Sequence, residues 1–261
     1  MTETRVLSKR ILQAPLPDLK VGPGKTTYSE LHDVAFVGTL SPWPDFEISV
    51  QACYDAQELS RSSTAVVTPG LYILEPEFVY IGDKYGVRRR FQQAIGQVLG
   101  VALAAQGVNL RFGDFACSGL EYNNPPDVVG LSTVGQPRYE LRLLGTLKTP
   151  WVAEHSLTRA YDNPGLLRHL LGQPLLYMGD LSTAFGFLST YDETISSGRS
   201  NWVPGNGWHN TRQLSIQLTS QSHGSGPSVT MRQCMFYVAK LASEQGPVNN
   251  QTPSAQWVVR Y

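Results

Sequence analysis

The sequence predicts an α/β (α+β) fold in which one mixed central sheet is flanked by helices. The clearest helical pattern lies at 86–106, where apolar residues repeat at three- and four-residue spacing. Short apolar runs typical of strands follow this helix, and they are separated by turn-rich segments such as Asn123–Pro126. Further helical and strand-like segments then alternate to the end of the chain, which is the order expected of a sheet covered by helices.

Three helices are expected. One face of the helix at 86–106 is apolar and consists of Phe91, Ile95, Val98, Leu99 and Ala102. A second helix is expected at 165–182, where Pro174 either kinks the helix or lies near its start. The third is expected at 228–243, with Ser228 as a plausible N-cap.

Strands are expected where β-branched and aromatic residues cluster, at 71–81, 108–112, 127–131, 139–148 and 185–195. A proline within 71–81 indicates an edge strand or a turn there. The segment 196–227 is rich in Gly, Ser, Asn and Pro and predicts a loop insertion with a possible strand at 213–219. The last five residues, 257–261, are either a final strand or a loose end.

The domain organisation follows from the same pattern. Residues 1–25 are polar and interrupted by Pro and Gly, so an extended N-terminal arm is expected there. Residues 26–261 then form a single domain, because 261 residues with 41% hydrophobic content can bury one full core.

Charge and cysteine content restrict the partners. The 21 basic and 21 acidic residues cancel, so a nucleic acid would have to bind a local patch rather than a globally basic surface. Three widely spaced cysteines suggest reduced thiols in an intracellular compartment, and a cytoplasmic location is expected. No signal peptide and no membrane-spanning run is expected, so membranes are excluded as partners.

Asp127 and Lys148 are the first candidates for chemistry. Asp127 precedes one strand-like run and Lys148 ends another, so in neighbouring strands both side chains can project into one cleft. A metal-dependent phosphodiesterase needs carboxylates for Mg²⁺ and a lysine to orient water, but the second carboxylate is missing because Thr146 stands in its place. The nearest acidic residues, Glu121 and Glu140, are not well placed by spacing. The alternative to a catalytic role is that Asp127 only closes a turn and that Lys148 is a solvated residue at the end of a strand.

A charge run opens the first predicted helix. Arg88, Arg89 and Arg90, with Lys84 just before them, form either a phosphate grip for tRNA or DNA or a solvated helix start. Cations near a helix N-terminus oppose the helix dipole, which favours an anionic partner. Among the histidines, His155 is the best functional candidate because it lies near Lys148.

Several motifs in the second half of the chain resemble those of a fungal protein family with a PD-(D/E)xK nuclease-like core. The central signature of that family is similar to Gly-Glu-x-Lys-Thr-Pro-Trp, and here it stands as Gly145-Thr146-Leu147-Lys148-Thr149-Pro150-Trp151. Three later motifs are matched in consistent order by Gly172, Gln173, Tyr177 and Met178, by Phe185-Gly186-Phe187-Leu188-Ser189-Thr190-Tyr191 and Thr194, and by Ser228 and Arg232. The resemblance implies the nuclease-like fold, but Thr146 departs from it.

The chain is also similar, in size and in its altered centre, to the fungal arginine-containing cyclodipeptide synthases. This resemblance implies acyl transfer from arginyl-tRNA and a second aminoacyl-tRNA to give a diketopiperazine, with no cofactor. Asp127, Thr146, Lys148 and Tyr177 would be the catalytic groups. Glu140, Gln173, Asp180 and His155 would bind substrate, with Asp127, Glu140 or Asp180 receiving the guanidinium.

Two alternatives stay open. Instead of an acyltransferase, the chain could be a nuclease that binds Mg²⁺ with a displaced acidic ligand. It could also be a non-catalytic nucleic-acid-binding protein. The sequence does not predict an oligomeric state.

Overall fold

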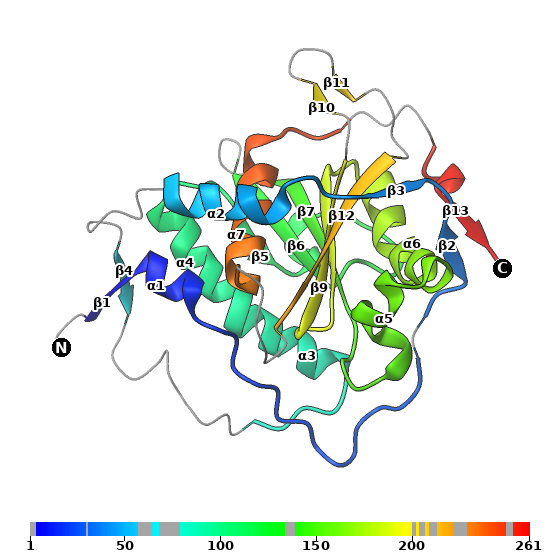
Figure 1. Cartoon of the computed structure of the whole chain (residues 1–261), viewed down its shortest axis with the longest axis horizontal. Coiled ribbons are helices and arrows are strands. Elements are labelled where there is room, and N and C mark those ends of the chain that lie inside the picture. The colour runs from blue at the N-terminus through cyan, green and yellow to red at the C-terminus, as the bar shows by residue number, and fades with distance from the viewer. Residues whose placement is uncertain are drawn as a thin grey trace.

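The fold is built around a mixed sheet of seven strands in the order β3-β12-β9-β8-β7-β6-β5 (Figure 1). The computed structural model describes residues 4–29, 31–56, 64–67, 79–133, 139–199, 202–203, 207–208, 213–221, 229–248 and 253–261. The strands of this sheet are β3 (Thr39–Pro42), β5 (Arg111–Gly113), β6 (Val128–Thr133), β7 (Tyr139–Leu147), β8 (Phe185–Ser189), β9 (Glu193–Arg199) and β12 (Gln213–Ser220). The predicted class, a mixed sheet flanked by helices, is therefore confirmed.

The sheet is mixed, with two parallel and four antiparallel pairs of neighbouring strands. β5, β6 and β7 pair antiparallel, β7 and β8 pair parallel, and β9 and β12 continue antiparallel. β3 then adds to β12 in parallel. Parallel neighbours need a crossover connection, and the chain between β7 and β8 supplies it with α5 (Leu157–Tyr161) and α6 (Pro164–Asp180).

Helices cover both faces of the sheet (Figure 1). One face carries a continuous helical segment made of α3 (Lys84–Phe91), a π-helical turn (Gln92–Gly96) and α4 (Gln97–Ala105), together with α7 (Met231–Glu244). α1 (Ser8–Gln13) and α2 (Phe46–Ala56) lie on these helices. The other face carries α6, and outside it lies the pair β2 (Val34–Phe36) and β13 (Val258–Arg260).

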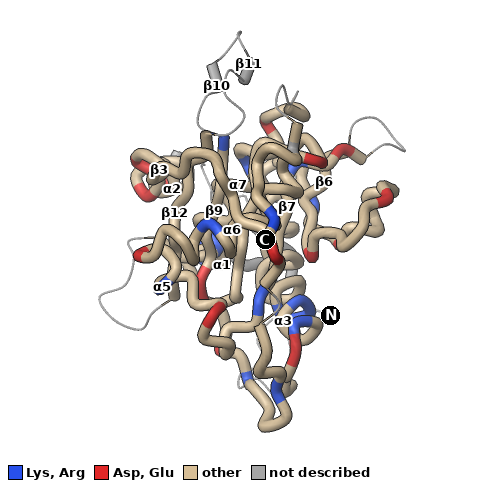
Figure 2. The backbone as a smooth tube through the Cα atoms, turned by 90° about the vertical axis from the view of Figure 1, so that its right-hand side faces the viewer, with Lys and Arg blue, Asp and Glu red and all other residues tan. Residues whose placement is uncertain are grey.

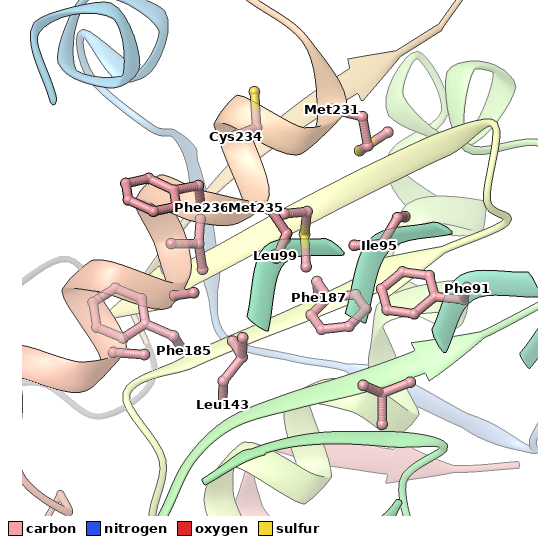
Figure 3. Close-up of a cluster of buried hydrophobic side chains, with 14 of the residues drawn as sticks. Phe91, Ile95, Leu99, Leu143, Phe185, Phe187, Met231, Cys234, Met235 and Phe236 are labelled. Atoms are coloured by element: carbon pink, nitrogen blue, oxygen red, sulfur yellow. The ribbon is translucent and has the colours of Figure 1, made fainter. Parts of the chain in front are cut away.

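A stacked pair of phenylalanines lies at the centre of the core on the α3 side (Figure 3). Phe91 of α3 and Phe187 of β8 have ring centroids 5.4 Å apart and an interplanar angle of 12°, and both are almost fully buried. The Phe187 ring also covers Gly145 of β7, where an added Cβ would lie 2.1 Å from Phe187 Cζ. Gly145 is therefore required by the close approach of this ring.

The predicted helices at 86–106, 165–182 and 228–243 are confirmed, with Pro174 inside α6. α7 begins with a capping box formed by Thr230 and Gln233, whereas the expected cap Ser228 lies outside the described residues. The predicted strands at 127–131, 139–148 and 213–219 are present, and 257–261 contains β13. The run at 108–112 contributes only the first two residues of β5, and the strand and turn expected at 185–195 are β8 and the turn that leads into β9. Most of the strand expected at 71–81 lies outside the described residues.

Two expectations need correction. The arm expected at 1–25 is not extended throughout, because α1 forms within it and buries Leu12 in the main core. The loop expected at 196–227 starts later than predicted, because β9 runs to Arg199, whereas β12 at 213–220 confirms the strand expected within it. Within the described ranges, no helix is both long enough and apolar enough to cross a membrane.

Candidate functional site at the end of β6 and β7

The alternation of side chains along β7 places two residues of the signature, Thr146 and Lys148, on the α6 face of the sheet. Gly145 and Leu147 face the core beneath α3, because Gly145 is covered by Phe187 and Leu147 belongs to the same cluster. Successive side chains of a strand point to opposite faces, so Thr146 and Lys148 face the α6 side. Both are almost completely buried, and the Lys148 backbone N–H donates to the carbonyl of Ser189 at 2.9 Å.

Asp127 lies across from Thr146 on the neighbouring chain segment. Val128 pairs with Gly145, and the Asp127 backbone N–H donates to the Gly145 carbonyl at 3.0 Å. One carboxylate oxygen, Oδ2, accepts the backbone N–H of Leu147 at 2.8 Å. The two strands thus hold the carboxylate rigidly beside the end of β7, as the order of strands predicted.

Lys84 forms an ion pair with this carboxylate. Its Nζ lies 2.9 Å from Asp127 Oδ2, and the two side chains are 24% and 14% exposed. Lys84 is the first residue of α3, which Asp83 caps by accepting the Gly86 N–H at 2.8 Å. Lys84 was expected to bind nucleic acid with the arginines, but the structure places it in the site around Asp127.

α6 contributes Gln173 and Tyr177, one helical turn apart. The Tyr177 hydroxyl donates to the Asn124 carbonyl and accepts from Gln173 Nε2. Burial raises the pKa of Tyr177 well above its usual value, and the negative charge of Asp127 raises it further. The phenol therefore stays protonated at neutral pH and keeps its hydrogen bond to the Asn124 carbonyl.

Two buried oxygens in this region have no hydrogen-bond partner within the described part of the chain. They are Thr146 Oγ1 and Gln173 Oε1. A buried polar atom without a partner carries a desolvation cost of about 1–3 kcal/mol, so such atoms commonly mark positions that a ligand or water completes. The site around Asp127 is defined here as Lys84, Asp127, Thr146, Lys148, Gln173 and Tyr177.

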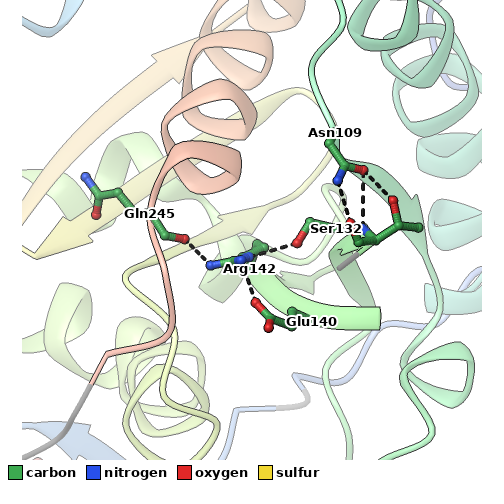
Figure 4. A network of polar contacts seen from close by, with 6 residues as sticks. Asn109, Ser132, Glu140, Arg142 and Gln245 are labelled. Carbon is green, nitrogen blue, oxygen red and sulfur yellow. Dashed lines mark hydrogen bonds and ion pairs between the residues drawn. The ribbon is translucent and has the colours of Figure 1, made fainter. Parts of the chain in front are cut away.

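Glu140 does not belong to this site (Figure 4). It lies six positions before Thr146 on β7, which corresponds to about 20 Å along a strand. Its carboxylate pairs with Arg142, which also donates to Ser132 Oγ and to the Gln245 carbonyl. Glu140 therefore neither replaces the missing carboxylate nor serves as a guanidinium acceptor near Lys148, and Glu121 is exposed elsewhere.

Asp180 and His155 lie at the edges of the region. Asp180, at the end of α6, accepts the hydroxyl of Tyr122, whose ring meets Tyr177 edge-on at a centroid distance of 5.5 Å. His155 is buried, and its Nδ1 lies 3.0 Å from the Thr149 carbonyl oxygen. His155 therefore braces the turn after Lys148, which is a structural role rather than the substrate contact that was expected.

The arginines of α3 divide by exposure, and Figure 2 shows the basic residues gathered on this helix. Arg90 is buried and donates to Gln93, so it is not available to a phosphate backbone, contrary to expectation. Arg88 is half-buried and Arg89 exposed, and both line an open groove together with Tyr85. These two retain the expected position for an anionic partner.

A cavity of about 620 Å³ lies next to the turn after β7 and was not predicted from the sequence. Trp151 and Thr190 form part of its wall, with the carboxylate residues Asp18, Asp192 and Glu193. None of the described residues that line it is Lys, Arg or His. No sequence signal could identify it, because the segments 15–21, 150–151 and 190–193 meet only in the folded chain.

Glu193 and Trp151 are fixed in the wall of this cavity. Glu193 accepts the Leu157 N–H at 2.6 Å and the hydroxyl of Thr158, so it caps α5. The Trp151 indole N–H donates to the Thr26 carbonyl at 2.8 Å. The cavity is therefore acidic and has one rigid aromatic side.

A divalent cation does not fit the site around Asp127. Asp127 is its one carboxylate, its Oδ2 is engaged by an ammonium group, and the neutral Thr146 hydroxyl is a weak Mg²⁺ ligand. Across the described ranges, no group of three His, Cys, Asp or Glu side chains is arranged to hold a metal ion.

Comparison with known proteins gives no assignment. No protein-family model, no curated protein and no solved structure matches the chain.

Proposed function

We propose that this chain is a tRNA-dependent acyltransferase that forms an arginine-containing cyclic dipeptide from aminoacyl-tRNAs on a repurposed nuclease-like fold. The observation that carries the proposal is the Lys84–Asp127 ion pair opposite Thr146. Where a nuclease needs two carboxylates and a metal ion, this site has one carboxylate, two lysine ammonium groups and the uncharged hydroxyl of Thr146. Such groups, among them the buried second lysine Lys148, suit proton transfer and hydrogen bonding to a reacting carbonyl better than phosphodiester hydrolysis.

The order of elements supports the nuclease-like part of the proposal. A helix (84–105), three antiparallel strands, a crossover helix and a fourth strand parallel to the third follow one another in the chain. This is the order expected of a PD-(D/E)xK core. Under the proposal, Asp127 and Lys148 would correspond to the aspartate and lysine of that core, and Gln173 and Tyr177 lie on the crossover helix.

The proposed reaction consists of two acyl transfers. In the first, the amine of one aminoacyl-tRNA attacks the ester carbonyl of the other, an amide bond forms, the ester C–O bond breaks, and the released tRNA hydroxyl takes the proton. In the second, the free amine of the dipeptidyl-tRNA attacks its own ester carbonyl and closes the ring, releasing the second tRNA. Lys148 can donate to the carbonyl or leaving oxygen, as can the Tyr177 phenol once its proton turns from the Asn124 carbonyl to the substrate, and Asp127 can accept from the amine.

The acidic cavity is the proposed place for the arginine side chain. The carboxylates of Asp18 and Asp192 are opposite in charge to a guanidinium, and the Trp151 ring offers a face on which a guanidinium can stack. The cavity begins two residues beyond Lys148, and the Lys148 N–H bonds to Ser189, next to Thr190 of the wall. An arginyl group in the cavity would thus direct its carbonyl toward the site around Asp127.

The groove along α3 is the proposed tRNA contact. Arg88 and Arg89 provide two positive charges, and Tyr85 is an exposed aromatic residue between the helix start and the groove. Phosphate contacts of this kind give affinity that falls with rising salt. This surface serves the same function in the non-catalytic alternative, so it supports tRNA binding without distinguishing the two.

The test is a mass-spectrometric comparison of metabolites from cells that express the wild type, Lys148→Ala or Lys240→Ala. Lys240 pairs with Glu244 on the surface of α7 and is the matched control for loss of a lysine. The expected result is a new arginine-bearing diketopiperazine with the wild type and with Lys240→Ala, and none with Lys148→Ala. In a reconstituted extract, ribonuclease should abolish the product. Absence of any such product, or a product that survives ribonuclease, would overturn the proposal.

A further inference from the structure

The Lys84–Asp127 pair has a more specific consequence for the chemistry of this site. We infer that Lys84 is the permanent counter-ion of Asp127 and takes the place next to this carboxylate that a divalent metal ion has in a nuclease. This inference rests on the proposed nuclease-like scaffold and deepens the proposed function, because it assigns the site a built-in counter-ion. Lys84 is thereby a residue that positions and balances Asp127 rather than a contact for tRNA.

The first argument is the occupancy of the carboxylate. Asp127 Oδ2 receives both the Lys84 ammonium at 2.9 Å and the Leu147 N–H at 2.8 Å. A carboxylate oxygen has two lone pairs, so these two donors account for its hydrogen-bonding capacity. A metal ion on the same carboxylate would have to displace Lys84 or lie within a few ångströms of its positive charge, where like-charge repulsion is strong.

The second argument is how Lys84 is held. It is the first residue of α3, and the cap formed by Asp83 fixes where that helix starts. Gly86 packs so closely on Ile81 that an added Cβ would lie 2.7 Å from Ile81 Cβ, which fixes the first turn from the other side. Lys84 is only 24% exposed. The ammonium group is therefore presented to Asp127 by rigid structure rather than by a mobile surface side chain.

The third argument is the residue opposite Asp127. Thr146 is 1% exposed and its Oγ1 lacks a hydrogen-bond partner within the described ranges. A glutamate at this position would add a second negative charge beside Asp127, which two cations or a divalent ion would have to balance. With threonine there, Asp127 is the one carboxylate of the site, and the Lys84 ammonium group is in direct contact with it. The uncharged residue 146 thus leaves no second negative charge that would call for a divalent ion.

Binding of Mn²⁺ to purified protein tests the inference directly. Isothermal titration would compare four proteins: the wild type, Thr146→Glu, Lys84→Met, and the double variant with both changes. The control is a double variant that combines Thr146→Glu with Lys240→Met. Methionine keeps most of the lysine stem but removes the charge. We expect no Mn²⁺ binding by the wild type and weak binding by Thr146→Glu. Adding Lys84→Met to Thr146→Glu should make binding at least about ten-fold tighter, and adding Lys240→Met should not. Equal affinities with and without Lys84→Met, or strong binding by the wild type, would overturn the inference.

A second measurement does not depend on the folding of Thr146→Glu. Lys84→Ala leaves space beside Asp127 that a small alkylammonium ion can fill. Ethylammonium chloride should therefore raise the melting temperature of Lys84→Ala relative to sodium chloride at the same ionic strength, and leave Lys240→Ala unchanged. Equal responses of the two variants would contradict the inference. Neither measurement involves tRNA or product, so either can succeed or fail independently of the proposed acyl transfer.

Discussion

Replacement of Gly145 by alanine should destabilise the protein because the β7 backbone and the Phe187 ring leave no space for a methyl group. An added Cβ would lie 2.1 Å from Phe187 Cζ and 2.6 Å from each Cε, far inside ordinary contact distance. The ring cannot simply rotate away, because it is 1% exposed and stacks on Phe91. Both rings and the strand would have to move together.

The expected cost follows from the size of this displacement. Overpacking of a core typically costs about 1–3 kcal/mol, and a ring that must move by more than 1 Å against a buried neighbour lies at the upper end, at about 3 kcal/mol. For a chain of this size, about 1 kcal/mol corresponds to about 2–4 °C in melting temperature, so Gly145→Ala should melt about 6–12 °C below the wild type.

Thermal and urea unfolding would measure this effect against a matched glycine. Gly100 lies in α4 with nothing within 4 Å of an added Cβ, so Gly100→Ala should stabilise the protein by about 0.5–1 kcal/mol. Adding Phe187→Leu to Gly145→Ala should recover part of the loss, because the smaller side chain vacates the contact. The reasoning is refuted if Gly145→Ala has the melting temperature of the wild type. It is also refuted if the stability loss of the double variant equals the sum of the losses of Gly145→Ala and Phe187→Leu.

Three further predictions concern the site and the thiols. Asp127→Ala removes the acceptor of two charge-assisted hydrogen bonds and should lower the free energy of unfolding in urea by about 2 kcal/mol. The surface control Glu244→Ala should lower it by less than about 0.5 kcal/mol, and equal losses would contradict a firmly held Asp127 carboxylate. Tyr177→Phe removes a buried donor and should lower the free energy of unfolding by about 1 kcal/mol. The same urea unfolding experiment would measure this loss, and a free energy of unfolding equal to that of the wild type would disprove it. Burial raises the pKa of the Cys234 thiol from 9.0 to about 12, so the folded state loses stability as pH rises from about 9 towards 12. At pH 8, alkylation followed by mass spectrometry should modify the exposed Cys117 and spare Cys234 until denaturant is added, and equal labelling would exclude this burial.

The sequence by itself determined the principal helices and strands. Helical spacing is a local property of neighbouring residues, which is why the patterns at 86–106, 165–182 and 228–243 marked the helices correctly. The strand order also placed Asp127 and Lys148 at one end of the sheet, since two sequential strands that pair antiparallel bring the start of one to the end of the other. The missing carboxylate at Thr146 was likewise evident from one position in a motif.

Only the tertiary structure decided which of these residues act together. Lys84 appeared to belong with the arginines that follow it, but the start of α3 carries it to Asp127 and leaves Arg90 buried. The acidic cavity requires three distant segments to meet, and α1 turns part of the expected arm into core. The physical reason is that a side-chain pair across elements depends on strand register and on where each helix begins, which are set by packing of the whole chain rather than by local spacing.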